Sequence, residues 1–225
     1  MQTSRFGREL IVDETFASLH RPGEIATLNV WDAIAAPLLA LPESRRKRVL
    51  LLGLGGGSVA RIIRALAPGA LIVGVEFDSE VVAAARAHFG LGALRLEVIV
   101  ADALDVLRRE RRRFDLVVED LFVGHGDAVR KPDWIPAPGL DLAERLLRPG
   151  GLLVSNNLDE ARRVGVHLRA RFPGLLSLEV DDYENRVFVA GPARLDARTL
   201  RAAVARDPVL GESVETMHFR DARRR

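Results

Sequence analysis

Short apolar runs alternate with segments of helical periodicity from residue 48 onward, and this alternation strongly restricts the possible folds. The apolar runs at 49–52, 71–77, 94–100, 114–119 and 152–155 have the length of buried strands. Helical patterns occupy 58–66, 79–89, 103–109, 140–147 and 160–172. Strands that alternate with helices in this way form a parallel sheet with helices on both faces. We therefore predict an α/β fold with a doubly wound sheet.

The flanking segments extend this prediction. Apolar runs at 175–180 and 186–190, separated by a polar turn, are expected to close the sheet as an antiparallel pair, giving seven mostly parallel strands. Residues 9–20 alternate apolar and polar side chains and indicate a small N-terminal β-hairpin. Residues 25–41 indicate a linking helix broken at Pro37. We divide the chain into 1–45, an α/β domain at 46–195, and a C-terminal helix with an Arg-rich tail at 196–225.

Composition excludes several classes of protein. The chain has no cysteine, which excludes disulfides and a thiol nucleophile, and it lacks the roughly 20-residue apolar run of a membrane span. Its net charge is only +2, and the arginine clusters at 45–48 and 108–113 are either solvated connections or a functional basic patch. We expect a cytoplasmic protein that binds neither nucleic acid nor a membrane.

A glycine-rich segment, L-L-G-L-G-G-G-S at 51–58, lies between the first predicted strand and its helix. Gly53, Gly55 and Gly57 allow the backbone to turn sharply and to approach a ligand closely. The helix that follows offers free N–H groups to an anionic or polar ligand. The spacing differs from the G-x-G-x-x-G dinucleotide pattern, because position 58 is Ser. The segment is therefore either a ligand-binding loop or an ordinary tight turn.

Acidic residues at the next two strand ends favour a ligand. Glu76, followed by Phe77, ends the second strand, and a carboxylate there can accept hydrogen bonds from both ribose hydroxyls. Asp102, followed by Ala103, ends the third strand, where a carboxylate can accept a hydrogen bond from the adenine amino group. The alternative is that these are turn and cap residues. Together with the glycine loop, they predict a nucleoside site.

Four stretches carry a resemblance to a known family over residues 8–190. They are the glycine loop, V-E-F-D-S-E-V-V at 75–82, A-D-A-L-D-V-L at 101–107 and F-D-L-V-V-E-D at 114–120. The sequence resembles the spermidine synthase family, aminopropyltransferases of polyamine biosynthesis built on the Rossmann-like methyltransferase fold. The resemblance implies S-adenosylmethionine or its decarboxylated form as cofactor, with ribose at Glu76 and adenine at Asp102 and Ala103. It also implies self-association, for example as a homodimer.

The sequence departs from that family at the amine site. Spermidine synthases carry an Asp where this chain has Gly56, and a second Asp after strand four where it has Val123. A diamine is cationic at neutral pH and needs carboxylates to bind it and to free a lone pair for attack. The donor pocket is therefore expected to be retained, whereas aminopropyl transfer to putrescine is doubtful.

Two residues remain as candidates for catalysis. Asp120 lies at the end of strand four, where open α/β sheets place their chemistry. His125 lies in the long loop that follows and is either a base near neutral pH or a solvated loop residue. The other histidines lack the spacing of metal ligands, so we predict no metal site.

Three functions follow from these observations. The favoured one is an S-adenosylmethionine-dependent transferase that moves a methyl group to a small-molecule acceptor. The second is aminopropyl transfer with Asp120, Glu119 or Asp127 in place of the missing carboxylate. The third is a catalytically silent nucleoside-binding protein.

Overall fold

The computed structural model describes residues 1–4 and 7–222. The strands within this part are β1 (Gln2–Ser4), β2 (Gly7–Val12), β3 (Thr15–His20), β4 (Arg48–Leu52), β5 (Leu71–Glu76), β6 (Glu97–Val100), β7 (Phe114–Glu119), β8 (Leu147–Asn157), β9 (Gly174–Val180), β10 (Arg186–Gly191) and β11 (Met217–Asp221). The α-helices are α1 (Val30–Ala35), α2 (Ser58–Leu66), α3 (Ser79–His88), α4 (Ala103–Arg109), α5 (Gly139–Arg145), α6 (Ala161–Arg171) and α7 (Ala197–Ala205). No helix in the described ranges is long and apolar enough to cross a membrane.

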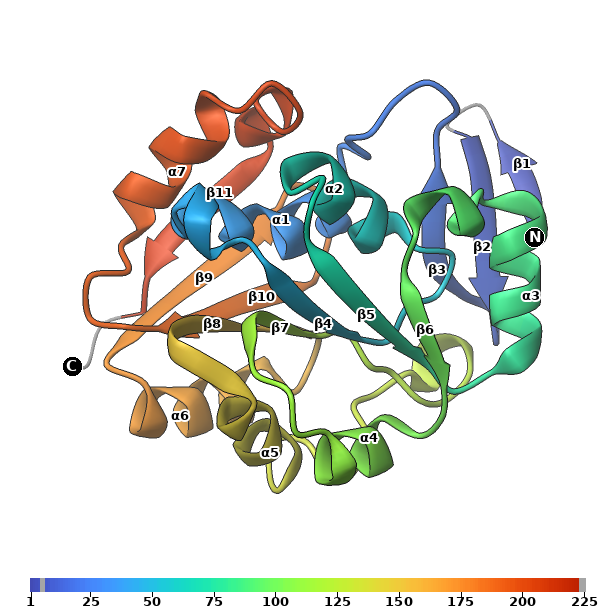
Figure 1. Ribbon diagram of the computed structural model, residues 1–225. Helices are drawn as coiled ribbons and strands as arrows, with labels where there is room; N and C mark the ends of the chain where they lie inside the picture. The colour runs from blue at the N-terminus through green and yellow to red at the C-terminus, as the bar shows by residue number, and fades with distance from the viewer. Residues whose placement is uncertain (5–6, 223–225) are drawn as a thin grey trace.

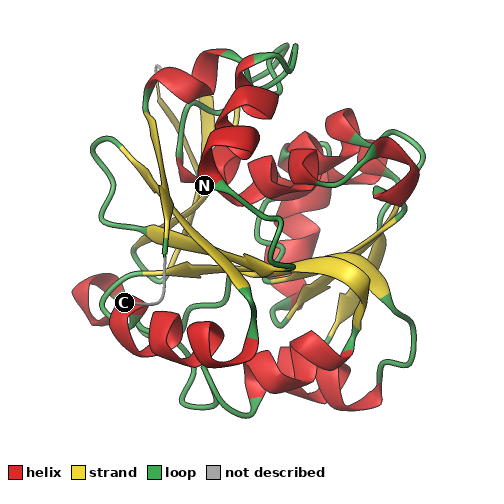
Figure 2. Ribbon diagram, turned by 90° about the vertical axis from the view of Figure 1, so that its left-hand side faces the viewer, coloured by secondary structure: helices red, strands yellow, loops and turns green. Residues whose placement is uncertain are grey.

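The main sheet confirms the doubly wound α/β prediction. Its strand order is β11-β9-β10-β8-β7-β4-β5-β6, with β6, β5, β4, β7 and β8 parallel. β10 runs antiparallel to both β8 and β9, as expected for the closing pair. Helices α1, α2 and α7 cover one face, and α4, α5 and α6 cover the other (Figures 1 and 2). The prediction of seven strands is wrong, because the sheet has eight.

The eighth strand comes from the C-terminal segment, for which the sequence indicated only a helix. That helix is α7, and β11 follows it and pairs antiparallel with β9. Only Met217 of β11 is buried, so the strand has no apolar run by which to recognise it. The three arginines at 223–225, the predicted Arg-rich end, lie outside the described residues.

Two hydrophobic cores follow from side-chain alternation along the buried strands. Val49 and Leu51 of β4 face the layer of α1, α2 and α7, whereas Leu50 and Leu52 face the layer of α4 to α6. Successive side chains of a strand point to opposite faces of a sheet, so a continuous apolar run fills both cores. β4 is therefore buried on both faces, and the glycine loop begins at its carboxyl end.

The N-terminal segment forms a small separate sheet of three strands, in the order β1-β2-β3. The predicted hairpin is β2 and β3, and β1 adds a strand that the sequence did not indicate. This sheet stands beside α3 (Figure 1), and Leu10 of β2 packs against Val81 and Phe89. The linking segment forms α1 followed by the 3₁₀ helix Ala36–Ala40, so the α-helix ends just before Pro37, in agreement with the predicted break. The predicted start at residue 25 is wrong, because α1 begins at Val30.

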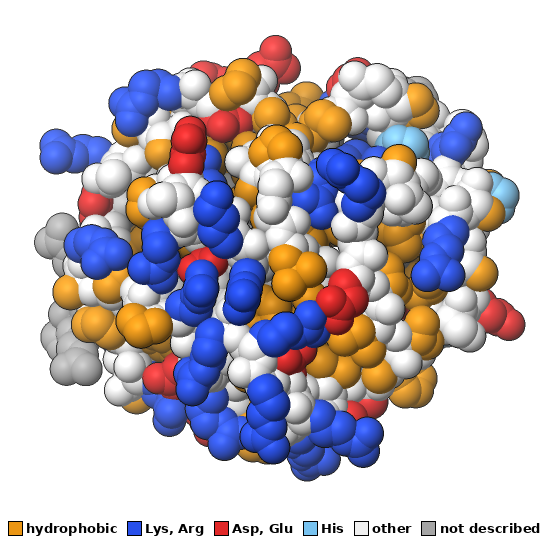
Figure 3. Space-filling model, viewed as in Figure 1, with side chains coloured by type: hydrophobic (Ala, Val, Ile, Leu, Met, Phe, Trp, Pro, Cys, Tyr) orange, Lys and Arg blue, Asp and Glu red, His pale blue; other side chains and the backbone are white. Residues whose placement is uncertain are grey.

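Lys and Arg side chains gather across the face shown in Figure 3. Members of the two arginine clusters make contacts within the molecule. Arg45 and Arg148 pair with Asp115, which is fully buried, at N–O distances of 3.3 Å each. Arg112 pairs with Glu97 and Glu110 at 2.8 and 2.7 Å. These arginines tie strand ends together at the amino edge of the parallel strands, opposite the edge that carries the glycine loop.

Candidate active site

The glycine loop connects β4 to α2 and approaches neighbouring backbone closely. Gly53 has a φ of +87°, and a Cβ placed on it would lie 2.3 Å from the carbonyl oxygen of Asp120. Gly57 has a φ of +86° and precedes the first turn of α2. Both positions therefore require glycine, because a side chain would be strained at these positive φ angles. At Gly53 it would also collide with the backbone of Asp120. Gly55, with a φ of +51°, lies between them.

Glu76, at the end of β5, holds this loop in place. One of its carboxylate oxygens accepts hydrogen bonds from the backbone N–H groups of Leu54 and Gly55, at 3.2 and 2.8 Å. The other oxygen accepts from Phe77 and Asp78, at 2.9 and 3.2 Å. β5 is the neighbour of β4, so the sheet itself brings Glu76 to the glycine loop.

The predicted adenine-binding residues lie at the next strand end. Asp102 follows β6, is exposed, and accepts a hydrogen bond from the backbone N–H of Leu104 at 2.7 Å, which makes it the N-cap of α4. Ala103 begins that helix and is buried. Phe77 is 75% exposed, which is unusual for a phenylalanine. The structure thus brings all the predicted nucleoside-site residues to one edge of three adjacent strands.

Asp120 lies on the other side of the glycine loop, directly after β7. It is half-buried, and its carboxylate accepts a hydrogen bond from the Asn156 side chain at 2.8 Å. Asn156 in turn accepts one from Asn185 at 3.0 Å. Burial raises the pKa of the Asp120 carboxyl above its ordinary value, while the Lys131 ammonium group and the Asn156 amide oppose this rise. A carboxyl group with a raised pKa is better suited to accept a proton than an ordinary surface aspartate.

Sequence reasoning missed a buried ion pair next to Asp120. The Lys131 ammonium group lies 2.6 Å from the Glu119 carboxylate, and both side chains are fully buried. Ser155 donates a hydrogen bond to the other Glu119 oxygen at 2.6 Å. The sequence holds one signal for this pair: Lys131 is one of only two lysines in a chain that otherwise uses arginine.

His125 does not contact Asp120 through any hydrogen bond or ion pair found in the described residues. Its ring lies 3.5 Å from the Glu14 carboxylate in the β2–β3 turn, and both side chains are mostly exposed. The next residue, Gly126, donates its backbone N–H to the Asp13 carbonyl at 2.8 Å. The long loop after β7 is thus attached to the tip of the N-terminal hairpin, and His125 takes part in that attachment.

Strand β3 of the hairpin forms a wall against the glycine loop. The Ser18 hydroxyl accepts a hydrogen bond from the backbone N–H of Gly56 at 2.7 Å. A Cβ placed on Gly56 would lie 2.8 Å from the Ser18 Cβ and 3.1 Å from the Phe89 ring. Ser58 exchanges hydrogen bonds with both backbone groups of Leu19, at 2.9 and 2.8 Å. The space beside residue 56 is therefore filled by the hairpin.

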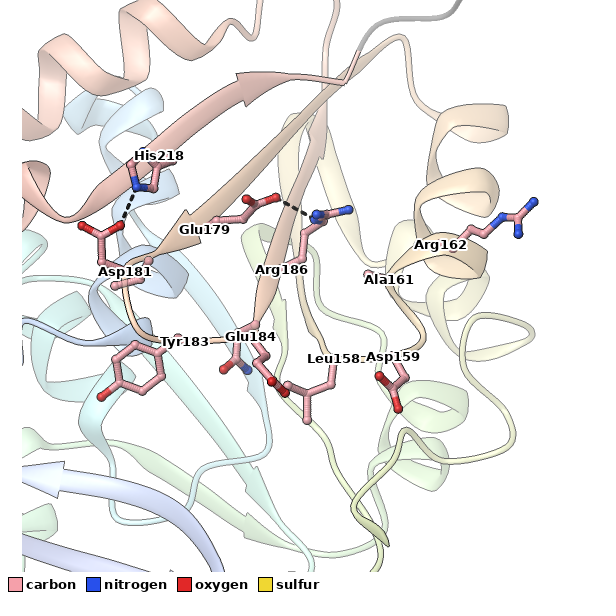
Figure 4. A pocket seen from close by; sticks show the side chains of 12 residues that line it. Leu158, Asp159, Ala161, Arg162, Glu179, Asp181, Tyr183, Glu184, Arg186 and His218 are labelled. Atoms are coloured by element: carbon pink, nitrogen blue, oxygen red, sulfur yellow. Dashed lines mark hydrogen bonds and ion pairs between the residues drawn. The ribbon is translucent and has the colours of Figure 1, made fainter. Parts of the chain in front are cut away.

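A surface pocket opens further along the same edge, over the ends of β8, β9 and β10 (Figure 4). Glu179 and Asp181 on its wall pair with Arg186 and His218. Asp159 and Glu184 also line the pocket, near Leu158 (Figure 4). Asn185 lines the pocket and hydrogen bonds to Asn156, which links the pocket to Asp120.

Comparisons with known proteins bear on this site. A family model described as a methyltransferase domain matches residues 49–151. A polyamine aminopropyltransferase of Chromobacterium violaceum is 35% identical over 114 residues, which is 49% of this chain and 42% of that protein. A Drosophila melanogaster protein, an eEF1A lysine and N-terminal methyltransferase homolog, is 28% identical over 63% of this chain and 23% of its own length. The chain thus spans less than half of the length of either relative.

Solved structures of similar proteins have the same fold as this chain. A probable spermidine synthase from Corynebacterium glutamicum superposes with a TM-score of 0.64 at 18% identity, covering 91% of this chain and 76% of that chain. Human methyltransferase-like protein 13, solved in complex with SAH, gives a TM-score of 0.62 at 22% identity, covering 83% of this chain and 90% of that chain. The fold is therefore the class I methyltransferase fold, with the candidate site at the carboxyl ends of its parallel strands. Within that class, the chain is similar to the spermidine synthase-like proteins, as the sequence motifs predicted.

Proposed function

We propose that this protein binds S-adenosylmethionine and transfers its methyl group to a small-molecule acceptor. One observation carries the choice of methyl over aminopropyl transfer. The family places a donor-binding Asp at position 56, and here Ser18 and Phe89 would have to shift to admit any side chain at Gly56. The loss of that carboxylate is therefore built into the packing of the hairpin against the loop.

The residues at this edge suit such a cofactor. The glycine loop leaves a cradle that side chains would fill, and Glu76 and Asp102 offer carboxylates for ribose hydroxyls and the adenine amino group. The exposed Phe77 ring offers an apolar surface to a base. When bound, S-adenosylmethionine would supply a methyl group on a positively charged sulfur. In-line attack of an acceptor atom on the methyl carbon would break the carbon–sulfur bond, with the neutral thioether as the leaving group.

The acceptor is proposed to lie near Asp120. This carboxyl group is positioned by Asn156 and, with its raised pKa, can take a proton from an acceptor that must lose one. The pocket of Figure 4 reaches this side of the site through Asn185 and Asn156. Its mixed charges suit a polar acceptor.

Aminopropyl transfer is a second candidate, supported by the 35% identity to a polyamine aminopropyltransferase. Asp159 and Glu184, which line the pocket, would then attract a diamine in place of the missing residues. Incubation with decarboxylated S-adenosylmethionine and a panel of amines separates the two candidates. Mass spectrometry should find no aminopropylated product if methyl transfer is the activity.

Thermal unfolding with S-adenosylmethionine, its decarboxylated form, methylthioadenosine and NAD tests the proposal. A ligand at 100 times its Kd adds about 2.7 kcal/mol, or roughly 5 to 10 °C in Tm for a chain of this size. We expect the largest shift with intact S-adenosylmethionine. A larger shift with the decarboxylated donor would support aminopropyl transfer, and no shift with any adenosine ligand would refute the donor site. Binding without turnover of any acceptor would favour a silent binding protein.

Replacement of Glu76 by Gln tests the donor site directly. The amide cannot accept hydrogen bonds at both positions, so we expect donor binding to weaken by about tenfold or more, as for the loss of a charge-assisted hydrogen bond. Isothermal titration calorimetry measures the effect. Glu80→Gln, an exposed change in the first turn of α3, is the matched control and should leave the Kd unchanged.

A further inference from the structure

The loop that follows β7 closes on itself. Val123 and Arg130 form an isolated antiparallel bridge, with both backbone hydrogen bonds at 2.8 Å. Lys131, at the end of the loop, donates a hydrogen bond from its ammonium group to the carbonyl of Leu121, at the start, at 3.0 Å. One side chain thus joins the two ends of the segment that carries His125.

Lys131 has further partners that leave its charge fully enclosed. Its ammonium group lies 2.6 Å from Glu119 and 4.0 Å from the centre of the Phe122 ring. Its backbone N–H donates to the Glu160 carboxylate at 2.7 Å. A carboxylate, a carbonyl and an aromatic face therefore surround the cation on the side of β7.

Stability alone does not account for this arrangement. Taking two charges out of water is costly, and well-packed apolar residues in place of a buried ion pair are often neutral or stabilising. Breaking such a pair by removing one partner is strongly destabilising. The buried Lys131–Glu119 pair is better explained by its effect on the neighbouring carboxyl group of Asp120.

Burial has the largest effect on the Asp120 carboxyl group and raises its pKa. The Lys131 ammonium and the Asn156 amide lower that pKa, and the Glu119 carboxylate raises it further. Glu119 and Asp120 are consecutive in sequence, so without a cation two adjacent carboxylates would share one partly buried strand end.

We propose that Lys131 is a positioning residue of the active site, which closes the loop from Leu121 onto β7 and places its ammonium group between Glu119 and Leu121, at the strand end that carries Asp120. This role rests on the proposed function of Asp120 as the acceptor-side base. Lys131 does not touch the acceptor itself and acts through Asp120 and the loop.

Paired variants test the electrostatic part of the proposal. In Lys131→Met/Glu119→Gln both charges are removed, so no buried charge is left alone. Lys131 lowers the Asp120 pKa by more than Glu119 raises it, so the loss of both charges should raise the Asp120 pKa in this double variant. In Glu119→Gln the cation remains and the pKa should fall. Carbon-13 NMR titration of aspartate carboxyl groups, with the Asp120 signal assigned by its loss in Asp120→Asn, measures both. An unchanged pKa in both variants would overturn the proposal.

Hydrogen exchange tests the closure of the loop. The amides of Val123 and Arg130 should exchange at least about tenfold faster in the double variant, because the bridge loses its anchor. Lys47→Met, at the opposite edge of the sheet, is the matched control and should change neither exchange nor the Asp120 titration. Unchanged exchange of these two amides in the double variant would contradict the clamping role.

The presence of only two lysines gives a direct check on burial. Reductive methylation of the folded protein should modify Lys47 and leave Lys131 unmodified, whereas rapid modification of Lys131 would contradict its enclosure. None of these readouts uses S-adenosylmethionine. Failure of the proposed function therefore appears separately, as absence of donor binding in the unmodified protein. The double variant should bind donor normally, because the glycine loop and Glu76 lie on other strands.

Discussion

Single side chains at the carboxyl edge of the sheet each have a local partner that fixes their orientation. Glu76 accepts four backbone hydrogen bonds, two from the glycine loop and two from the residues that directly follow it. A carboxylate has about four acceptor positions, and the backbone donors already use them. The ribose hydroxyls of the proposed donor must therefore share these positions with the backbone donors or replace them. Gly56 shows the opposite constraint, because Ser18 and Phe89 occupy the space where its side chain would be.

Gly56→Ala should destabilise the folded protein. Its Cβ would lie 2.8 Å from the Ser18 Cβ, close to the backbone of β3, so the hairpin must shift. Overpacking of this kind costs about 1 to 3 kcal/mol, measurable by urea unfolding. Gly69→Ala is the control, because nothing lies within 4 Å of a Cβ there. Equal stability of the two variants would contradict the close packing of β3 on the loop.

The raised pKa of Asp120 predicts a pH dependence of stability. Between its unfolded and folded pKa values, the native protein binds more protons than the unfolded chain, so the free energy of unfolding falls as pH rises through that window. Asp120→Asn keeps an acceptor for Asn156 but does not titrate. The stability of the unmodified protein minus that of the variant should therefore fall with increasing pH and level off above the folded pKa. Urea unfolding over a pH series measures this difference, and a difference that rises with pH would show that the pKa is lowered instead. The exposed Asp127→Asn is the control.

At the scale of elements, the N-terminal hairpin contacts two parts of the site at once. β3 is hydrogen bonded to the glycine loop through Ser18 and Ser58, and the β2–β3 turn is hydrogen bonded to the loop after β7. A hairpin is marginally stable alone and depends on such contacts. The hairpin therefore acts as a wall of the site.

Ser58→Ala should weaken the attachment of β3 to the glycine loop and lower the stability of the folded protein. The change leaves the buried N–H and carbonyl of Leu19 without the partner that both now use. Unsatisfied buried polar groups cost about 1 to 3 kcal/mol, so a comparable loss of stability is expected in chemical unfolding. The exposed Ser44→Ala serves as the reference and should change stability by no more than about 0.5 kcal/mol. A loss no larger than that of the reference would mean that β3 is not held through Ser58.

At the scale of the whole molecule, the segment that precedes the parallel strands and the segment that follows them pack into the same core. Asp32 of α1 is fully buried and accepts a hydrogen bond from Ser213 at 2.7 Å, across 181 residues of sequence. Leu210 and Val214 join the core beneath α1, α2 and α7, and β11 extends the main sheet. The C-terminal segment is therefore part of the α/β core.

Leu210→Ala tests that integration. The side chain is fully buried, and its truncation should cost about 2 to 5 kcal/mol through lost burial and the cavity left behind. If the segment were a loose appendage, differential scanning calorimetry would show the main transition unchanged. Val166→Ala, at a site that is 60% exposed, is the comparison and should have little effect.

The sequence by itself determined the parallel core and the strand ends at which the proposed donor site lies. Apolar periodicity and glycine spacing are local properties, and they placed the glycine loop, Glu76, Asp102 and Asp120 at strand ends that the sheet brings together. Their roles in binding and catalysis remain predictions, as does that of His125, which the structure places against Glu14 instead of Asp120.

Only the tertiary structure decided the remaining features. β11 is a strand because the edge of β9 is available to pair with it, although its own side chains are mostly exposed. Ser18 fills the space beside Gly56 from 38 residues away, and Lys131 finds Glu119 across a closed loop. Such contacts depend on the path of the chain between the partners, and no local pattern of residues encodes that path.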